Sequence, residues 1–378
     1  MMKTLSTRTK RIVITGGHLT PAQAVIEELK KRGEWEIYYL GRKYSLEGQM
    51  IPSIESEVIP KLGVKFIPFP AGRFQRRFSS STFLSLLRIP FAFVYSLALL
   101  LKIRPGVILS FGGYVSLPIV VTGWFLRIPI LTHEQTVVSG LANQINAHFA
   151  QKVFISFPES LKHFSRNKVI LTGNPIRKEI FTYHISHITY HISQEKLPLL
   201  YITGGNQGAQ VINQAVVAVL SELLQKYRII HQCGKLDFNH ITYHISHITS
   251  RLRNRYLLTD YVDSKDIGWV LNQADLIVSR AGANIVSELA ALGKPAILIP
   301  LPWAYKDEQI RNAQMLVGVG TAVILSQTKC NGKNLKDAID EMMDNIEDFK
   351  ANASKAKKII IKDADQKIVD QIFNLLER

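Results

Sequence analysis

Three glycine-rich turns carry the residue types best suited to holding a diphosphate. They are 15–18 (TGGH), 111–116 (FGGYVS) and 203–209 (TGGNQGA), and each follows a short apolar run. Glycine lets the backbone approach a phosphate closely, and the helix after such a turn directs free N–H groups and its positive dipole end at the anion. Each turn alone is weak evidence. None has GxGxxG spacing with an acidic residue about 20 positions later, which disfavours a nicotinamide site.

Individual polar residues near such turns have two interpretations. His18 is either a helix-capping or exposed histidine, or a base that works near neutral pH. Glu288 is either a solvated helix carboxylate or an acceptor for a ribose hydroxyl pair. The polar stretch 306–313 follows an apolar strand, where a sugar-binding loop or a plain polar turn would lie.

The elements that must position these residues are short strands separated by helices. The first series of predicted strands covers 11–15, 36–40, 64–68, 107–110, 128–132 and 152–156. The second covers 199–203, 227–232, 274–279 and 296–300. Apolar strands alternating with helices indicate parallel sheets covered on both faces, with ligands at the carboxyl ends of the strands.

Two such series predict two doubly wound α/β domains. We expect an N-terminal domain over 1–180, a linker over 181–197 and a C-terminal domain over 198–378. The pattern of residues 351–378 predicts one or two amphipathic helices. The last helix could pack on either domain, including the N-terminal one.

Composition supports an ordinary globular protein. The chain has 378 residues, 47% of them hydrophobic and 20% charged, which argues against extensive disorder. Two cysteines cannot form a disulfide framework or a four-thiolate zinc site, so a reducing compartment is expected. The first residues pass into a short strand and glycines, so we expect no signal peptide.

The net charge of +16 is concentrated in one region. Between 58 and 133 there are nine basic residues and no Asp or Glu, which favours an anionic partner. The same region holds the apolar stretch 83–103, in which Arg88 and Pro90 predict a break into two shorter pieces. A spanning helix, a core helix and a surface that dips into the membrane interface all fit this stretch. Interleaved aromatic and basic side chains favour the last, on Arg73, Phe74, Arg76, Arg77 and Phe78.

One histidine-rich repeat stands outside this pattern. TYHISHITYHIS (182–193) recurs as HITYHISHITS (240–250). Helical spacing of its histidines would suit a metal, but its Ile, Thr, Ser and Tyr content favours extended loops, where the rings would not converge. No carboxylate or cysteine within the repeat completes a ligand set, so we predict no metal site.

Taken together, the segments resemble one family. TGGHLTPAQAVIEEL, FGGYVS, HEQ followed by GLAN, GNPIR, GGNQGA and SRAGANIVSELA occur in the order seen in the peptidoglycan N-acetylglucosaminyltransferases. The resemblance covers most of the chain apart from the histidine-rich repeats and the extreme ends. It implies the GT-B architecture, two Rossmann-like parallel-sheet domains facing across a cleft.

The resemblance also implies roles for individual residues. The implied catalytic and acceptor-side residues are His18, Tyr114 and Glu134. Those implied around the acceptor diphosphate are Gly17, Gly112 and Gly113. Those implied at the donor are Thr15, Gly16, Gly17, Thr136, Arg177, Asn206, Val262, Ala283, Asn284, Ile285, Val286, Ser287, Glu288 and Gln309. Val262 would contact uracil through its backbone, Glu288 the ribose and Gln309 the sugar.

The implied reaction is inverting transfer of GlcNAc from UDP-GlcNAc to the MurNAc 4-hydroxyl of undecaprenyl-diphospho-MurNAc-pentapeptide. A histidine or carboxylate would accept the proton of that hydroxyl, and backbone amides would stabilise the leaving diphosphate without a metal or cofactor. The protein would serve peptidoglycan biosynthesis, and through it cell shape and division, as a peripheral protein on an anionic membrane surface at the cytoplasmic face of the bacterial cell membrane, with no nucleic-acid partner.

The chain departs from the family pattern at three points. The first turn lacks an extra glycine pair before TGGH, Thr136 stands where Asn is common, and Asn206 stands where Ser is common. Three alternatives remain at this stage: a related transferase with another lipid acceptor such as diacylglycerol, an inactive sugar-nucleotide-binding protein, and a nucleic-acid binder with salt-dependent affinity.

Overall fold

The computed structural model describes residues 10–44, 52–70, 80–182, 188, 191–245 and 248–377. The chain forms two compact units, Met1–Ile176 with Ile361–Arg378, and Arg177–Ile360. It therefore passes between the units twice, after residue 176 and again after residue 360.

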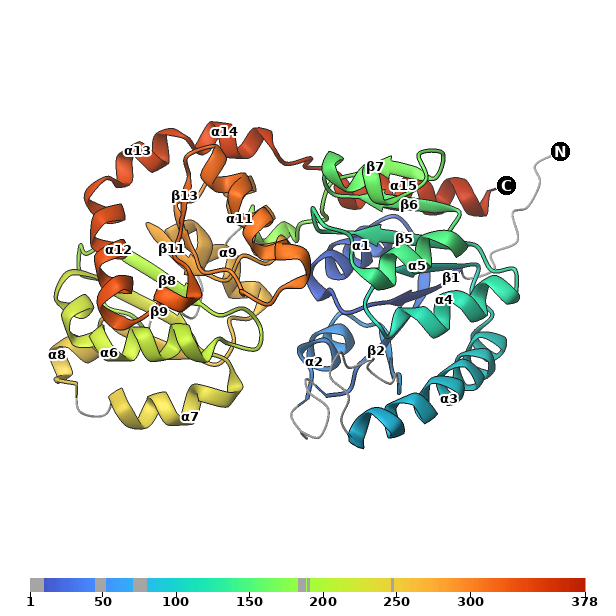
Figure 1. Ribbon diagram of the computed structural model, residues 1–378, viewed down its shortest axis with the longest axis horizontal. Coiled ribbons are helices and arrows are strands. Elements are labelled where there is room, and N and C mark those ends of the chain that lie inside the picture. Colours follow the sequence, from blue (N-terminus) through green and yellow to red (C-terminus); the bar gives the residue numbers. More distant parts are fainter. Residues whose placement is uncertain are drawn as a thin grey trace. The chain divides into compact units, whose positions relative to one another are not determined.

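The described residues of the first unit form a seven-stranded sheet of order β3-β2-β1-β4-β5-β6-β7 (Figure 1), in which all strand pairs are parallel. The strands are β1 (Lys10–Thr15), β2 (Trp35–Gly41), β3 (Lys65–Pro68), β4 (Val107–Ser110), β5 (Ile130–Glu134), β6 (Lys152–Ile155) and β7 (Val169–Leu171). The helices are α1 (Leu19–Lys31), α2 (Ile54–Lys61), α3 (Ser80–Ile103), α4 (Ser116–Phe125), α5 (Leu141–Phe149) and α15 (Ala364–Leu376), with a 3-10 turn at Pro158–His163.

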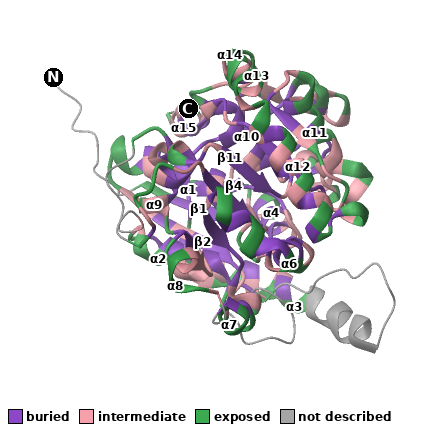
Figure 2. Ribbon diagram, turned by 90° about the vertical axis from the view of Figure 1, so that its left-hand side faces the viewer, coloured by how far each residue is buried: buried purple, intermediate pink, exposed green. Residues whose placement is uncertain are grey.

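The core of this unit is built from alternating residues of the sheet. Val13, Ile108 and Ile130 pack with buried residues of α3 and α4 on one face. On the opposite side, α15 packs against α1, and Arg32 at the end of α1 forms an ion pair with Asp370. Helices on both faces explain why β4 is buried along its whole length. Figure 2 shows this concentration of burial on the strands.

The described residues of the second unit form a six-stranded parallel sheet of order β10-β9-β8-β11-β12-β13. The strands are β8 (Leu199–Thr203), β9 (Arg228–Gln232), β10 (Tyr256–Thr259), β11 (Leu276–Ser279), β12 (Ala296–Leu298) and β13 (Ala322–Ile324). The helices are α6 (Gln210–Lys226), α7 (Lys235–His244), α8 (Ser250–Arg253), α9 (Ser264–Gln273), α10 (Ala283–Leu292), α11 (Glu308–Gly318), α12 (Gly332–Asp344), α13 (Ile346–Ala351) and α14 (Ala353–Lys358). Short 3-10 turns lie at Lys178–Ile180, Tyr305–Asp307 and Gln327–Lys329.

In each sheet, the order in which successive strands are added reverses at one point. In the first unit the chain order changes between β1 and β4, and in the second between β8 and β11. Because crossovers between parallel strands are right-handed, the helices that follow the two central strands cover opposite faces, which opens a crevice at the carboxyl ends of those strands. The three glycine turns follow β1, β4 and β8, so each lies at such a reversal point.

The sequence-based strands agree with this fold, and the doubly wound class is confirmed. Three edge strands, β7, β10 and β13, were not predicted from the sequence.

The predicted break at Arg88 and Pro90 is wrong, because α3 runs continuously from Ser80 to Ile103 with Pro90 inside it. Buried residues on the later turns, such as Ala92, Leu100 and Ile103, anchor the helix to the core and compensate for the missing N–H. Within the described chain, no helix combines the length and apolar character needed to cross a membrane.

The predicted extended structure of the second histidine-rich repeat is wrong for 240–244, which form the last turns of α7. Of the first repeat, 183–187, 189 and 190 lie outside the described residues.

Candidate active site

The first two glycine turns lie against each other at the reversal point of the first sheet. A Cβ atom on Gly16 would come within 2.9 Å of the Phe111 carbonyl carbon, and one on Gly113 would lie 3.4 Å from the Gly17 nitrogen. Gly112 and Gly113 adopt φ values of +74° and +78°, which side chains rarely tolerate. Glycine at these positions therefore brings two backbone turns close enough to share one ligand.

His18 is the residue at the entrance to α1. It occupies the N-cap position, but its side chain makes no capping hydrogen bond, so the capping interpretation is wrong. Burial, followed by the positive charge of Arg42, lowers the pKa of His18 from 6.5 to about 4. The imidazole is therefore neutral at physiological pH and has a lone pair that can accept a proton.

Arg42 connects several groups near His18, and sequence reasoning missed it. Its guanidinium lies 6.0 Å from the centre of the Tyr114 ring and 3.5 Å from Oε1 of the buried Glu55. Burial works against the charge of Arg42, but Glu55 and Tyr114 more than offset it and raise the pKa of Arg42. The sequence did carry a signal for Arg42: it is a basic residue directly after the second strand, and ligands of parallel sheets bind at the carboxyl ends of the strands.

Glu134, at the end of β5, is fully engaged within its own loop. Oε1 accepts hydrogen bonds from the backbone and hydroxyl of Thr136 at 3.0 and 2.7 Å, and Oε2 from Gly140 N and Asn143 Nδ2 at 3.0 Å each. The side chain is 1% exposed, and burial raises the pKa of its carboxyl despite these bonds. Through these bonds Glu134 holds the two ends of loop 134–140 together, with Thr136 as one of its partners.

The second glycine turn is held from beneath by a buried asparagine. Asn146, on α5, donates from Nδ2 to the hydroxyls of Ser110 and Ser116 at 3.1 and 2.8 Å. The Ser110 hydroxyl accepts from Gly112 N at 3.1 Å, and the Ser116 hydroxyl donates to Gly113 O at 2.8 Å. Asn146 therefore supports both sides of the turn, and no motif in the sequence singled it out.

The third glycine turn leads directly into α6, whose N-terminus is suited to bind an anion. Gly205 and Gly208 have φ values of +84° and +77°, and a Cβ on Gly208 would lie 1.9 Å from the Cys233 carbonyl oxygen. The N-cap residue, Ala209, has no side chain to bond the first amides of the helix, and the first turn contains no acidic residue. Asn206 is exposed at the tip of the turn. A helix of this length with uncapped amides favours an anion at its N-terminus.

Gln232 links this turn to the next loop. Its Nε2 donates to Gly205 O at 3.1 Å, while its Oε1 accepts from Val262 N at 3.1 Å and from Tyr201 Oη at 3.0 Å. Val262 is 2% exposed. Its N–H is occupied by Gln232, so the backbone group that remains for a base at this residue is the carbonyl.

Arg177 and Glu288 form a buried bidentate ion pair. Arg177 Nε lies 2.7 Å from Glu288 Oε1, and its Nη2 lies 3.0 Å from Oε2. The side chains are 14% and 2% exposed, which rules out a solvated helix carboxylate. Burial opposes the charge of Arg177, but the Glu288 carboxylate outweighs it and raises the pKa of Arg177. Since a guanidinium has five N–H donors and Glu288 takes two, Arg177 retains donors for a diphosphate.

The remaining predicted donor residues surround α10 and α11. Residues 283–288 form the first turns of α10, whose N-cap, Gly282, also lacks a side-chain cap. Gln309 lies in the first turn of α11, where its Oε1 accepts from Leu301 N at 3.0 Å. Lys306 and Asp307 before it have φ values of 48° and 57°, so this loop holds two strained residues in succession.

The predicted acceptor-side residues all lie in the first unit, at the carboxyl ends of β1, β4 and β5. Arg177, Asn206, Val262, 283–288 and Gln309 all lie in the second unit, where Arg177 contacts Glu288 and Gln232 links Val262 to the Gly205 turn. All the predicted donor and acceptor-side roles stay predictions, including the donor roles of Thr15, Gly16, Gly17 and Thr136. The five predicted membrane residues, Arg73, Phe74, Arg76, Arg77 and Phe78, lie outside the described residues.

The two units match two domains of one class of glycosyltransferases. The glycosyltransferase family 28 N-terminal domain matches residues 14–155, and the glycosyltransferase family 28 C-terminal domain matches residues 199–371. The chain belongs to glycosyltransferase family 28.

Relatives within the family carry a more specific name. The chain is 33% identical over 356 residues to a UDP-N-acetylglucosamine--N-acetylmuramyl-(pentapeptide) pyrophosphoryl-undecaprenol N-acetylglucosamine transferase of Clostridium botulinum (strain Kyoto / Type A2), covering 92% of this chain and 95% of the relative. It is 35% identical over 374 residues to a protein of the same name, numbered 2, from Bacillus cereus (strain ATCC 14579), covering 94% and 99%.

Solved structures share the fold. The chain aligns with Acinetobacter baumannii MurG with a TM-score of 0.67 and 24% identity, covering 97% of this chain and 99% of that one. It aligns with the UDP-GlcNAc 2-epimerase of Neisseria meningitidis bound to UDP-GlcNAc with a TM-score of 0.65 and 14% identity, covering 97% and 100%. At these identities the likeness establishes the GT-B fold alone.

Proposed function

We propose that the protein transfers GlcNAc from UDP-GlcNAc to the MurNAc 4-hydroxyl of undecaprenyl-diphospho-MurNAc-pentapeptide. The observation that carries this proposal is similarity at 33–35% identity over more than 90% of the chain to transferases named for that reaction. The site geometry supports it, because each unit has a glycine-turn site suited to a diphosphate. One site would take the prenyl-linked acceptor and the other the nucleotide sugar.

On the acceptor side, His18 is the proposed base. Its lowered pKa keeps it neutral, so it can accept the proton that the 4-hydroxyl loses while attacking the anomeric carbon. The paired turns at Gly17 and Gly113 would hold the acceptor diphosphate through backbone N–H groups. The Arg42 guanidinium beside Tyr114 adds positive charge to the same place.

On the donor side, the turn at Gly205 and the N-terminus of α6 would hold the UDP diphosphate. The leaving group gains negative charge as the glycosidic bond of the donor breaks, and preorganised amides and the Arg177 guanidinium would stabilise that charge. Glu288 would hold Arg177 in place. Each of its carboxylate oxygens accepts one bond from Arg177 and has a further lone pair that would accept a hydrogen bond from a ribose hydroxyl. A single displacement of this kind inverts the anomeric centre.

The test follows UDP release from UDP-GlcNAc with a short-chain prenyl-diphospho-muramyl-pentapeptide as acceptor. We expect UDP release that depends on the acceptor, and a higher rate with UDP-GlcNAc than with UDP-glucose. Thermal unfolding provides a second measure, because UDP-GlcNAc should raise the Tm more than UDP-glucose does. Equal rates and equal Tm shifts for both sugars would contradict the donor assignment, and release without acceptor would contradict the acceptor assignment.

We further propose that the protein docks peripherally on an anionic membrane at the cytoplasmic face, through α3 and α4. These helices pack against each other and carry large exposed apolar side chains: Phe91, Val94, Leu97, Leu101, Trp124 and Phe125. Exposed basic residues, Lys102, Arg104 and Arg127, lie on or directly after the same helices. Apolar anchors beside cations match the chemistry of an anionic lipid surface.

A further inference from the structure

The last turns of α7 bring together two histidines of the second repeat. His240 and His244 are four residues apart on one helix, and their ring centroids lie 4.5 Å apart with the rings nearly perpendicular. Both side chains are exposed, so they are reachable from solvent. Two imidazoles at this spacing on one helical face are a recognised arrangement for a transition-metal ion.

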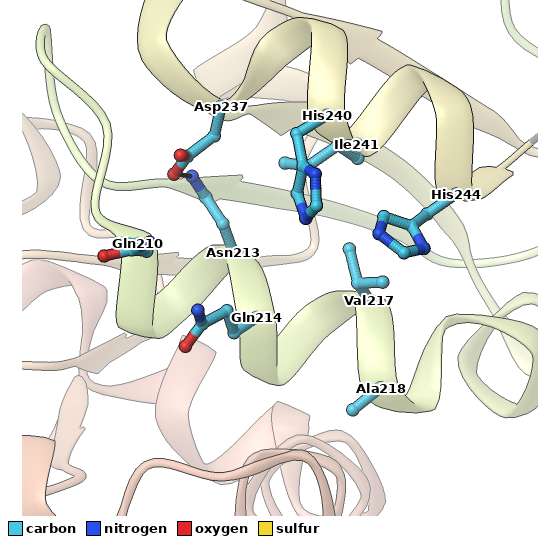
Figure 3. Close-up of a pocket in the computed structure, with 9 residues that line it drawn as sticks. All are labelled: Gln210, Asn213, Gln214, Val217, Ala218, Asp237, His240, Ile241 and His244. Atoms are coloured by element: carbon cyan, nitrogen blue, oxygen red, sulfur yellow. Dashed lines mark hydrogen bonds between the residues drawn. The ribbon is translucent and has the colours of Figure 1, made fainter.

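The two rings line a cavity between α6 and α7 with a volume of about 260 Å³. Figure 3 shows them side by side above α6, with Val217 beneath His244 and Gln214 on the facing helix. A water occupies about 30 Å³ in the liquid, so the cavity has room for an ion with several waters. The residues described as lining it include no Lys or Arg that would repel a cation.

A carboxylate lies one turn before His240 at the edge of the same cavity. Asp237 Oδ2 accepts a hydrogen bond from Asn213 Nδ2 at 2.7 Å, which fixes the position of this negative charge. Among the described residues no three His, Cys, Asp or Glu side chains are arranged to hold a metal ion directly. The protein therefore offers two nitrogen ligands, with water in the other positions and Asp237 as a nearby counter-charge.

We propose that His240 and His244 form a surface site for a divalent transition-metal ion. Imidazole suits Cu²⁺, Ni²⁺ and Zn²⁺, whereas Mg²⁺ requires oxygen ligands. The order of affinity follows Cu²⁺ above Ni²⁺ and Zn²⁺, with Mn²⁺ much weaker. Because the ion joins two successive turns of α7, it stabilises the helical form of the repeat. The site is independent of the proposed transferase reaction.

The test is calorimetric titration of the untagged full-length protein with Ni²⁺, Zn²⁺ and Mg²⁺ after removal of trace metal. We expect His240→Ala and His244→Ala each to remove one bound equivalent of Ni²⁺ or weaken it at least tenfold, with no binding of Mg²⁺. His191→Ala, in the first repeat, is the matched control and should retain this equivalent. Ni²⁺ should also raise the Tm of the wild type more than that of either variant.

Two outcomes would overturn the proposal. One is the absence of Ni²⁺ and Zn²⁺ binding to the wild type at millimolar metal. The other is binding that neither substitution weakens, which would place the metal on other histidines. Transfer activity of both variants should stay within about twofold of the wild type, which shows that they are folded and separates this proposal from the proposed function.

Discussion

At the scale of single residues, the site depends on how burial and charge set protonation. His18 and His133 both have a pKa lowered from 6.5 to about 4, with burial as the main cause. In the unfolded chain each binds a proton below pH 6.5, whereas in the folded protein each remains neutral until about pH 4. Their contribution to stability is therefore complete above pH 6.5 and is lost as the pH falls from 6.5 to 4.

We predict that His18→Gln lowers kcat by about 10²–10⁴-fold, which is the usual range for removal of a general base. UDP-GlcNAc affinity, measured by calorimetry, should change less than twofold. The pH–rate profile of the wild type should keep its rate down to about pH 5, since the pKa of His18 is about 4. Unchanged kcat in the variant, or an acid limb centred near pH 6.5, would remove His18 from this role.

At the scale of elements, the two glycine turns of the first unit depend on helices behind them. Asn146 on α5 bonds the serines on both sides of the Gly112–Gly113 turn, and it is fully buried. Buried N–H donors are costly to leave without acceptors, so the two bonds from Asn146 Nδ2 fix the turn in one conformation. A turn held this way keeps its N–H groups directed at a ligand before the ligand arrives.

We predict that Asn146→Leu raises KM for the lipid acceptor about tenfold. The affinity for UDP-GlcNAc should stay within twofold, because the donor residues lie on other elements. A double-mutant cycle with Ser116→Ala should show coupling, since Ser116 is one of the two partners of Asn146. Asn239→Leu, an exposed asparagine on α7, is the matched control. A fall in Tm with KM unchanged would show a purely structural role and contradict the positioning role.

At the scale of the whole molecule, two features matter: the double crossing of the chain and the exposed apolar surface. Gly173, just before the first crossing, has φ of +88°, and a Cβ there would lie 2.7 Å from Ile361 Cβ, just after the second. The two crossing segments are therefore in contact. Arg177 begins the second unit directly after the first crossing, so its ion pair with Glu288 anchors that segment.

We predict that Phe91→Ser combined with Phe125→Ser releases the protein from anionic liposomes. These side chains are 57% and 72% exposed, so the loss of folding stability should be small while the membrane anchors are removed. Sedimentation with phosphatidylglycerol vesicles measures the bound fraction. Leu236→Ser is the control: this apolar residue on α7 is 55% exposed, close to Phe91, and the variant should bind like the wild type. Equal pelleting of the double variant and the wild type would contradict docking through α3 and α4.

The sequence determined the fold class and the places of the glycine turns. Apolar strands, helices and glycines are local signals, and the order of motifs such as FGGYVS and GGNQGA indicated the family that the comparisons confirm. Its local signals failed where packing outweighed them. Pro90 lies inside α3 because the core holds the later turns, and His240 lies in α7 because Ile241 and Ile245 are buried against the second unit's core.

Only the tertiary structure decided which side chains meet. Arg177 and Glu288 are 111 residues apart, and Asn146 lies 36 and 30 residues after its partners Ser110 and Ser116. No local pattern in the sequence therefore reveals these contacts. Gln232 and Asn146 were missed for the same reason, whereas Arg42 was missed although its place directly after the second strand was a signal. Residue types and spacing fix what chemistry is available along the chain, whereas burial and long-range hydrogen bonds fix the charge state and direction of each group.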